Sequence, residues 1–224
     1  MKKISGIIFD LDGVITDTSE FHFLAWKELA DTLGVEINRA FNEKLKGISR
    51  MESLELILDH GNISEKFTVD EKLALATKKN DHYKQLIETV TQDDILPGIE
   101  DLLIEIKSEN IKIGVASASR SASIVIGRLG ITNYFDYIID SNTVIHGKPD
   151  PEIFLKVADY LNIPAVNCIG IEDAYAGVKA INAAGMFSVG VEDTIPLDEA
   201  DFVVKHTKSL SFQKIKEEFE RIIQ

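Results

Sequence analysis

The stretch ISGIIFDLDGV, from Ile4 to Val14, decides the fold of this chain. Residues 4–9 form a short apolar run with β-branched side chains, which is typical of a buried strand. The run ends at Asp10, and Asp12 and Gly13 follow directly. Two carboxylates this close repel each other, so the pair implies a cation or a raised pKa on one of them. Taken alone, an acidic pair after an apolar run is more often a solvated loop or a helix cap.

Helical spacing replaces the strand pattern after this stretch. Apolar side chains recur every four residues over 17–33, and Asp17 with Glu20 resembles a capping box. Further helical patterns cover about 40–59 and 69–90, and no convincing strand lies between them. The sequence therefore predicts a helical segment directly after the first strand.

Near Leu96 the pattern changes again, and strands alternate with helices. Such alternation favours an α/β fold with a Rossmann-like, doubly wound parallel sheet covered by helices on both faces. We therefore expect a core domain made of residues 1–15 and 95–224, with residues 16–94 inserted as a helical cap domain. The later strands are expected at Ile111 to Ala116, Tyr137 to Asp140, Val166 to Ile171, Phe187 to Val191 and Phe202 to Val204, and helices at about 98–109, 121–129, 151–161, 173–184 and 208–223.

Polar side chains follow several of these strands at the point where each one ends. In a doubly wound sheet, ligands bind beyond the carboxyl ends of the strands, so these side chains are expected to meet. Carboxylates gathered there would make an all-oxygen site suited to Mg²⁺, and a serine hydroxyl with a lysine would hold a phosphoryl group. The residues concerned are Asp10, Asp12, Ser117, Ser119, Lys148, Glu172 and Asp173.

The overall charge narrows the class of substrate. The 224 residues carry a formal net charge of -13, which repels nucleic acid and anionic membranes, so a phosphorylated small molecule needs a local positive cluster. A single cysteine, Cys168, excludes an intrachain disulfide and suits a reducing compartment. No apolar run approaches the roughly 20 residues of a membrane helix, so we expect a cytoplasmic protein, with a monomer as the default.

Four motifs taken together resemble the haloacid dehalogenase superfamily. They are DLDGV at 10–14, Ser117 at a strand end, Lys148 before Pro149, and GIED at 170–173. The resemblance implies that Asp10 is the nucleophile, which forms an aspartyl phosphate, and that Asp12 is the general acid and base. It further implies that Ser117 and Lys148 bind the transferring phosphoryl group, and that Mg²⁺ is held by Asp10, the backbone carbonyl of Asp12, Glu172 and Asp173.

Four further segments are distinctive: Thr16-Asp17-Thr18 with His22 and Trp26, residues 45–50 with Ser53, Lys79-Asn80-Asp81, and residues 116–120. Together they are similar to the β-phosphoglucomutase family. The resemblance implies conversion of β-D-glucose 1-phosphate to glucose 6-phosphate through β-glucose 1,6-bisphosphate, with a small-molecule sugar phosphate as the partner. Ala174 and Tyr175 stand where related mutases often have a serine and another polar residue, which leaves the fine substrate preference open. The implied substrate-binding residues are Thr18, His22, Trp26, Lys46, Gly47, Arg50, Ser53, Lys79, Asn80, Ala118, Ser119, Arg120 and Ser121.

Two alternatives stay open at this point. A capped phosphatase acting on a sugar phosphate or another small phosphate ester would use the same aspartate nucleophile and would release phosphate steadily. A non-catalytic binding protein would keep the fold, but the complete set of acidic, serine and lysine residues argues against it. Trp26 also has a second reading, as packing in the interior of the insertion, and Arg50 and Arg120 are as compatible with an ordinary surface position.

Overall fold

The computed structural model describes residues 3–45, 48–192 and 196–223. Its contacts divide the chain into two compact units. The sheet unit comprises Met1–Asp17 and Thr91–Gln224, and the helical unit comprises Thr18–Val90. The helical unit is thus inserted after the first strand of the sheet unit.

A six-stranded sheet, counted over the described residues, forms the sheet unit, and its neighbouring strands pair in parallel. The strand order is β3-β2-β1-β4-β5-β6, so β1 lies between β2 and β4. This arrangement confirms the predicted α/β fold with a doubly wound parallel sheet. The strands are β1 (Gly6–Phe9), β2 (Lys112–Val115), β3 (Tyr137–Ile138), β4 (Cys168–Glu172), β5 (Phe187–Val191) and β6 (Phe202–Val204).

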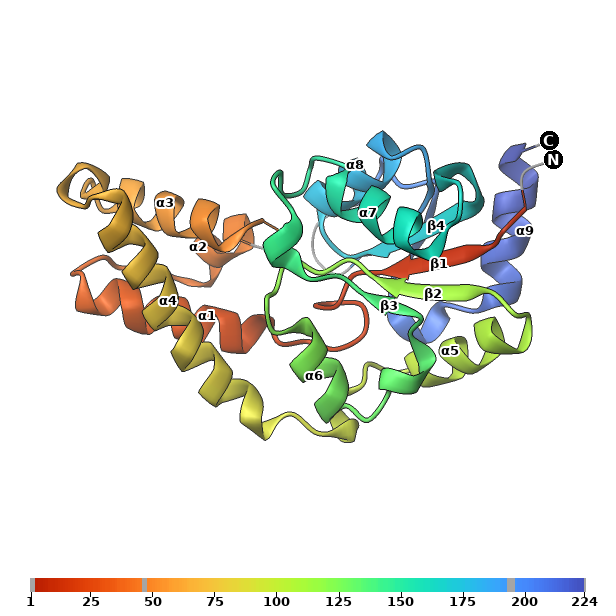
Figure 1. Cartoon of the computed structure of the whole chain (residues 1–224), viewed down its shortest axis with the longest axis horizontal. Coiled ribbons are helices and arrows are strands. Elements are labelled where there is room, and N and C mark those ends of the chain that lie inside the picture. Colours follow the sequence, from red (N-terminus) through yellow and green to blue (C-terminus); the bar gives the residue numbers. More distant parts are fainter. Residues whose placement is uncertain (1–2, 46–47, 193–195, 224) are drawn as a thin grey trace. The chain divides into compact units, whose positions relative to one another are not determined.

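Helices cover both faces of this sheet. Figure 1 shows α7 and α8 on one face and α5 on the other. On the first face, Phe154 and Val157 of α7 and Ile181 of α8 are buried against Ile8 of β1, and this apolar layer fixes the helices over the central strands. The helices of the unit are α5 (Ile99–Ser108), α6 (Ala122–Arg128), α7 (Glu152–Leu161), α8 (Tyr175–Ala183) and α9 (Phe212–Ile223).

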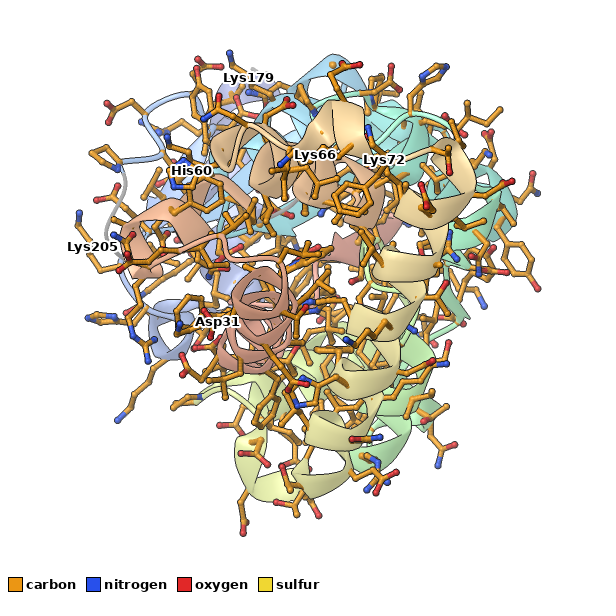
Figure 2. All side chains as sticks on the ribbon, turned by 90° about the vertical axis from the view of Figure 1, so that its left-hand side faces the viewer. Asp31, His60, Lys66, Lys72, Lys179 and Lys205 are labelled. Atoms are coloured by element: carbon orange, nitrogen blue, oxygen red, sulfur yellow. The ribbon has the colours of Figure 1, made fainter. Side chains whose placement is uncertain are left out.

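The helical unit has an apolar core of its own, in which Trp26 and Leu54 are buried. Capping boxes begin two of its helices, with Ser49 and Glu52 before α3 and with Thr68 and Glu71 before α4. Figure 2 shows this unit with its side chains, including Lys72 on α4. The helices are α1 (Ser19–Thr32), α2 (Arg39–Asn42), α3 (Arg50–His60) and α4 (Val69–Leu86). Within the described ranges, no helix combines the length and apolar content that a bilayer crossing requires.

Several predicted helix limits were wrong. The helix expected from Asp17 begins at Ser19, and its N-cap residue Thr18 makes no side-chain capping bond because its backbone is not extended (φ -97°, ψ 9°). The pattern over 40–59 belongs to two helices, because α2 ends at Asn42 and α3 begins at Arg50. The last part of the 69–90 pattern is a 3₁₀ turn at Ile87–Thr89.

Candidate active site

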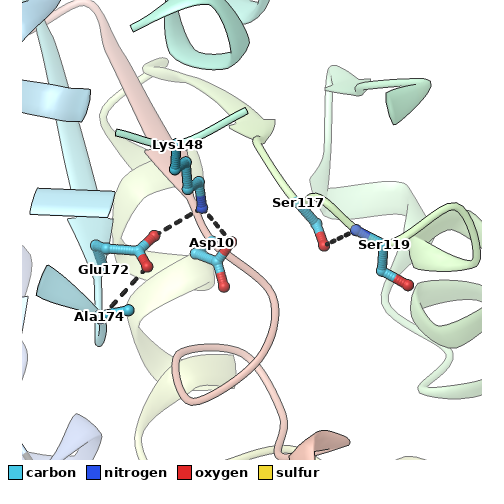
Figure 3. A network of polar contacts seen from close by, with 6 residues as sticks. All are labelled: Asp10, Ser117, Ser119, Lys148, Glu172 and Ala174. Carbon is cyan, nitrogen blue, oxygen red and sulfur yellow. Dashed lines mark hydrogen bonds and ion pairs between the residues drawn. The ribbon is translucent and has the colours of Figure 1, made fainter. Parts of the chain in front are cut away.

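A buried lysine joins the ends of the two central strands β1 and β4 (Figure 3). Lys148 Nζ donates to Asp10 Oδ1 at 2.6 Å and to Glu172 Oε2 at 2.9 Å. The Lys148 residue is only 1% exposed, and its Nζ also lies 5.1 Å from the centre of the Phe154 ring. In this strand order the direction of winding reverses between β1 and β4, which is where such sheets form their ligand crevice. The structure therefore brings three of the predicted residues together at the expected edge.

Burial and the neighbouring charges have opposite effects on the pKa of Lys148. Burial by itself lowers the pKa of Lys148, but the charges of Asp10 and Glu172 outweigh it and raise that pKa above its ordinary value. Burial and the neighbouring charge of Asp10 raise the pKa of Glu172 well above its ordinary value, although Lys148 opposes the shift. The lysine is therefore held as a cation, whereas the two buried carboxylates are only partly neutralised.

Asp173 adds a third carboxylate to the site. One ligand oxygen each from Asp10, Glu172 and Asp173 lie within 4.8 Å of one another. Three carboxylates around one ammonium leave an excess of negative charge, and an all-oxygen set of this kind fits a hard divalent cation. The geometry thus gives a candidate metal site beside the Lys148 ammonium.

Two glycines leave the space in which these carboxylates lie. Gly13 has φ +75°, and a Cβ placed on it would be 2.0 Å from Asp173 Oδ2. A Cβ on Gly177, in the first turns of α8, would be 2.0 Å from Glu172 Cδ. Asp173 therefore packs directly against the backbone of Gly13, and Glu172 against the backbone of Gly177.

A ladder of serines follows β2. The Ser119 backbone N–H donates to Ser117 Oγ at 3.1 Å, and the Ser121 N–H donates to Ser119 Oγ at 3.3 Å. Ser117 and Ser121 are buried, and within the described part of the chain Ser121 Oγ has no hydrogen-bond partner. Helix α6 begins at Ala122, directly after this ladder and close to the predicted start at about residue 121. Arg120 is exposed, and Ala118 is half-buried.

Asp12 lies in the turn that leads out of β1. The turn is closed by a hydrogen bond from the Gly13 N–H to the Thr16 carbonyl at 2.8 Å, and Asp12 forms an isolated β-bridge with Thr16. Asp12 is half-buried. Its predicted roles, as general acid and base and as a carbonyl ligand of the metal, stay predictions.

In the helical unit, four predicted substrate-binding residues, Thr18, His22, Trp26 and Lys79, lie close to one another. Thr18, His22 and Trp26 recur at intervals of four, and so share a face of the chain entering α1. Lys79 Nζ lies 2.7 Å from His22 Nδ1 and 4.7 Å from the Trp26 ring centre. Burial, and then the charge of Lys79, lower the pKa of His22 well below its ordinary value, so the imidazole is neutral at pH 7.

The other predicted residues of the insertion are less closely grouped. Ser53 is buried, and its hydroxyl donates to the Ser49 carbonyl at 3.0 Å in the first turn of α3. Arg50 begins the same helix, and Asn80 is half-buried on α4. Trp26, at 3% exposure, packs in the core of the unit, as its second reading expected. The predicted residues Lys46 and Gly47 lie outside the described residues.

Two residues that the sequence analysis did not single out support these groups. Tyr83 is fully buried, stacks on the His22 ring with 3.9 Å between ring centres, and shares a hydrogen bond of 2.9 Å with Thr18. Its position four residues after Lys79 on one helix face was the available indication. Glu152, directly after Pro151, is bonded to the loop that carries Lys148. An acidic residue at a helix start is too common to identify it from sequence alone.

Comparison with known proteins agrees with this geometry. The haloacid dehalogenase-like hydrolase family model matches residues 4–185. The chain is 50% identical over 218 residues to a β-phosphoglucomutase of Bacillus subtilis, covering 97% of this chain and 96% of that enzyme. It is 30% identical to a phosphorylated carbohydrates phosphatase of Thermotoga maritima, covering 82% of each chain.

Comparison with solved structures also gives similarity to a β-phosphoglucomutase. A crystal structure of β-phosphoglucomutase from Clostridium difficile superimposes with a TM-score of 0.96 at 52% sequence identity, covering 98% of this chain and 99% of that one. The family match and the arrangement of acidic and lysine side chains lead to one conclusion: the chain belongs to the haloacid dehalogenase-like hydrolase family.

Proposed function

We propose that the chain is a β-phosphoglucomutase, which interconverts β-D-glucose 1-phosphate and glucose 6-phosphate. The observation that carries the proposal is the buried contact of Lys148 with Asp10 and Glu172, beside Asp173, at the ends of β1 and β4. The 50% identity with the Bacillus subtilis enzyme over 97% of the chain supports the sugar-phosphate substrate and the mutase reaction.

Asp10 is proposed as the group that carries the phosphoryl between the two sugar positions. Its carboxylate oxygen bonds to phosphorus while the bond from phosphorus to the ester oxygen breaks, and Asp12 gives a proton to that leaving oxygen. An anion that approaches a phosphoryl dianion meets strong repulsion, which the Lys148 ammonium offsets. In the second half of the reaction, Asp12 takes a proton from a sugar hydroxyl, and that oxygen accepts the phosphoryl from Asp10.

Mg²⁺ is the proposed metal. Asp10, Glu172, Asp173 and the backbone carbonyl of Asp12 would hold it, since Mg²⁺ accepts carboxylate and carbonyl oxygens together with substrate phosphate. When bound, it supplies positive charge that lowers the repulsion at the reacting phosphoryl. Ser117 would bind the same phosphoryl through its hydroxyl, and Lys148 through its ammonium.

The helical unit, residues 16–94 in the predicted division, is proposed as a cap that excludes water from the phosphorylated aspartate. A mutase must also bind the second phosphate of β-glucose 1,6-bisphosphate, and arginines grip phosphate with two parallel hydrogen bonds. We assign that phosphate to Arg50, Ser53, Ser119, Arg120 and Ser121, and contacts with the sugar to Thr18, His22, Lys46, Gly47, Lys79, Asn80 and Ala118, whereas Trp26 packs in the core of the helical unit.

One assay tests the proposal against its nearest rival. The enzyme is given β-glucose 1-phosphate, Mg²⁺ and a trace of the bisphosphate, and glucose 6-phosphate and free phosphate are measured in parallel. Formation of the isomer with little phosphate supports the mutase. Steady release of phosphate without isomer would instead support a sugar-phosphate phosphatase, the activity named for the Thermotoga maritima relative.

A further inference from the structure

The loop that carries Lys148 is tied to the start of the helix that follows it. The loop lies between a 3₁₀ turn at Ser141–Thr143 and helix α7, which begins at Glu152. The Lys148 ammonium lies 2.6 Å from Asp10 Oδ1 and 2.9 Å from Glu172 Oε2. Because residues 144–151, all of which the structure describes, form no strand, contacts with a neighbouring helix help to fix the position of this amine.

Glu152 supplies such contacts with both of its carboxylate oxygens. Its Oε1 accepts from the Ile145 N–H at 2.9 Å, and its Oε2 accepts from the His146 N–H at 2.7 Å. Lys156, one turn further along α7, pairs with Oε1 at 2.6 Å and also donates to the Thr143 carbonyl. Two successive peptide groups of the loop are thereby held by one charged side chain.

The far end of the loop is bound to the same helix start. Asp150 Oδ1 accepts from the Glu152 N–H at 2.9 Å, and the Asp150 N–H donates to the Gly147 carbonyl at 3.0 Å. Helix α7 itself is anchored, because Phe154 is fully buried in the core of the sheet unit. The loop is therefore fastened on both sides of Lys148 to an element that does not move easily.

We propose that Glu152 is a positioning residue that sets the place of the Lys148 ammonium in the active site. It acts through the loop backbone and not on the reacting atoms. The ionised form of Glu152 makes these bonds: the hydrogen bond from Lys156, followed by those from the Ile145 and His146 N–H groups, lowers its pKa to about 2. The carboxylate is thus present throughout the pH range in which the enzyme would work.

The role of Glu152 rests on the proposed function of Lys148, and it extends that function to the residue that holds the loop. Glu152→Ala is expected to lower kcat about 10- to 100-fold, because a displacement of about 1 Å can cost this much. The KM for the sugar phosphate should change little. Hydrogen exchange should become faster at residues 144–150.

Asp159→Ala is the matched control, because it removes an exposed carboxylate from the same helix. Glu152→Asp should restore part of kcat, and Glu152→Gln, which keeps the size but loses one acceptor, should fall between Asp and Ala. These two variants decide the matter if the alanine variant does not fold. Activities are expressed per folded molecule, so that a loss of stability alone leaves kcat unchanged.

A kcat for Glu152→Ala or Glu152→Gln within about twofold of Asp159→Ala would overturn the proposal. A fall in kcat without faster exchange at residues 144–150 would overturn it as well. The variants are assayed in parallel with acetyl phosphate, whose cleavage needs Asp10 and Lys148 but no sugar. If the wild-type protein cleaves acetyl phosphate and does not isomerise the sugar phosphate, the mutase proposal fails, whereas the role of Glu152 is still measured.

Discussion

Two groups of three charges lie at opposite edges of the same sheet, and their signs are reversed. At the carboxyl edge, Lys148 bonds to two carboxylates, Asp10 and Glu172. At the amino edge, where β2 and β3 begin, Asp136 pairs with Lys107 and Lys112 at 2.9 Å each. The first group is buried and has an excess of negative charge, whereas the second is partly exposed and has an excess of positive charge.

The difference in burial and charge balance shows which of the two groups is suited to bind a further cation. Asp136 is satisfied within the fold, since its Oδ2 also accepts from the Ile113 N–H at 2.9 Å, and water can stabilise the extra positive charge. At the other edge, Glu172 is fully buried, and its pKa is raised by burial and by Asp10. Uncompensated negative charge out of reach of water is costly unless a cation joins it. We therefore expect the carboxyl edge to respond to substitution in activity and metal binding, and the amino edge only in stability.

The largest effect is expected for Asp10→Asn. This change removes the proposed nucleophile, so turnover should fall by at least about 10⁴-fold. The fold should remain, because the amide has almost the same shape. The mutase assay and circular dichroism measure the two properties. Asp136→Asn is the control and should keep nearly full activity; an Asp10→Asn protein with normal turnover would exclude Asp10 as the phosphoryl acceptor.

Lys148→Met should be the next most damaging change. It removes the ammonium and leaves Asp10 and Glu172 buried side by side, which is expected to cost about 3 kcal/mol of unfolding free energy without metal at pH 7. Lowering the pH towards the usual carboxyl range should restore part of this loss, because the raised pKa of Glu172 means that the folded state takes up a proton more readily than the unfolded chain. Urea unfolding at several pH values measures the effect. If Lys148→Met is as stable as the wild-type protein at pH 7, the proposed electrostatic role of Lys148 beside Asp10 and Glu172 is contradicted.

Removal of Mg²⁺ should have a comparable effect on the wild-type protein. A cation that binds only the folded state at a hundred times its Kd adds about 2.7 kcal/mol to the unfolding free energy. Thermal unfolding with Mg²⁺ and with a chelator is the measurement. Asp173→Asn should reduce the difference, and Asp136→Asn should leave it unchanged. An equal shift in both variants would argue against a metal site at Asp10, Glu172 and Asp173.

The smallest effect belongs to the amino edge. Burial raises the pKa of Asp136, but hydrogen bonds from Lys107, the Ile113 N–H and Lys112 outweigh it and lower the pKa to about 2. A lowered carboxyl pKa stabilises the fold above the unfolded pKa near 4 and loses this contribution as the pH falls through about 2. Because the pair is partly exposed, Asp136→Asn should cost only about 1 kcal/mol at pH 7.

The unfolding free energies of the wild-type protein and of Asp136→Asn, measured at pH 7 and at pH 2, test this pH dependence. Most of the cost should be lost at pH 2, and the cost should shrink in high salt, which screens partly exposed charges. A cost that stays constant across this pH range would show that Asp136 acts through packing and not through its charge.

The sequence predicted the strands better than the details around them. Phe187 to Val191 and Phe202 to Val204 have the limits that their apolar runs indicated. The helix cap expected at Asp17 lies one residue later, at Thr18, because the N-cap position depends on backbone angles, which a list of residues does not contain. The pattern over 40–59 kept its helical spacing across the break between α2 and α3, so the apolar period alone did not reveal it.

Some residues of the candidate site could likewise be predicted from the sequence, and others could not. Asp10, Lys148 and Glu172 could be placed together from sequence, because parallel strands deliver their carboxyl ends to one edge. Glu152 and Tyr83 could not. The partners of Glu152 are backbone N–H groups of a loop. Tyr83 lies on α4, and its partners are His22 of α1 and Thr18, the N-cap residue of α1. Such contacts depend on three-dimensional proximity. The spacing of four residues between Lys79 and Tyr83 indicates a shared helix face but does not identify the partners of Tyr83.

Gly13 and Gly177 limit how this site can be varied by mutation. A single methyl group at either position would overlap a carboxylate that faces the proposed metal, by the 2.0 Å approaches described above. Alanine, usually the mildest replacement in a mutational scan, should therefore be among the harsher ones here. A library that spares every charged residue but randomises these two positions would still lose activity, so a map of tolerated substitutions should outline the site by its smallest residues as clearly as by its acids.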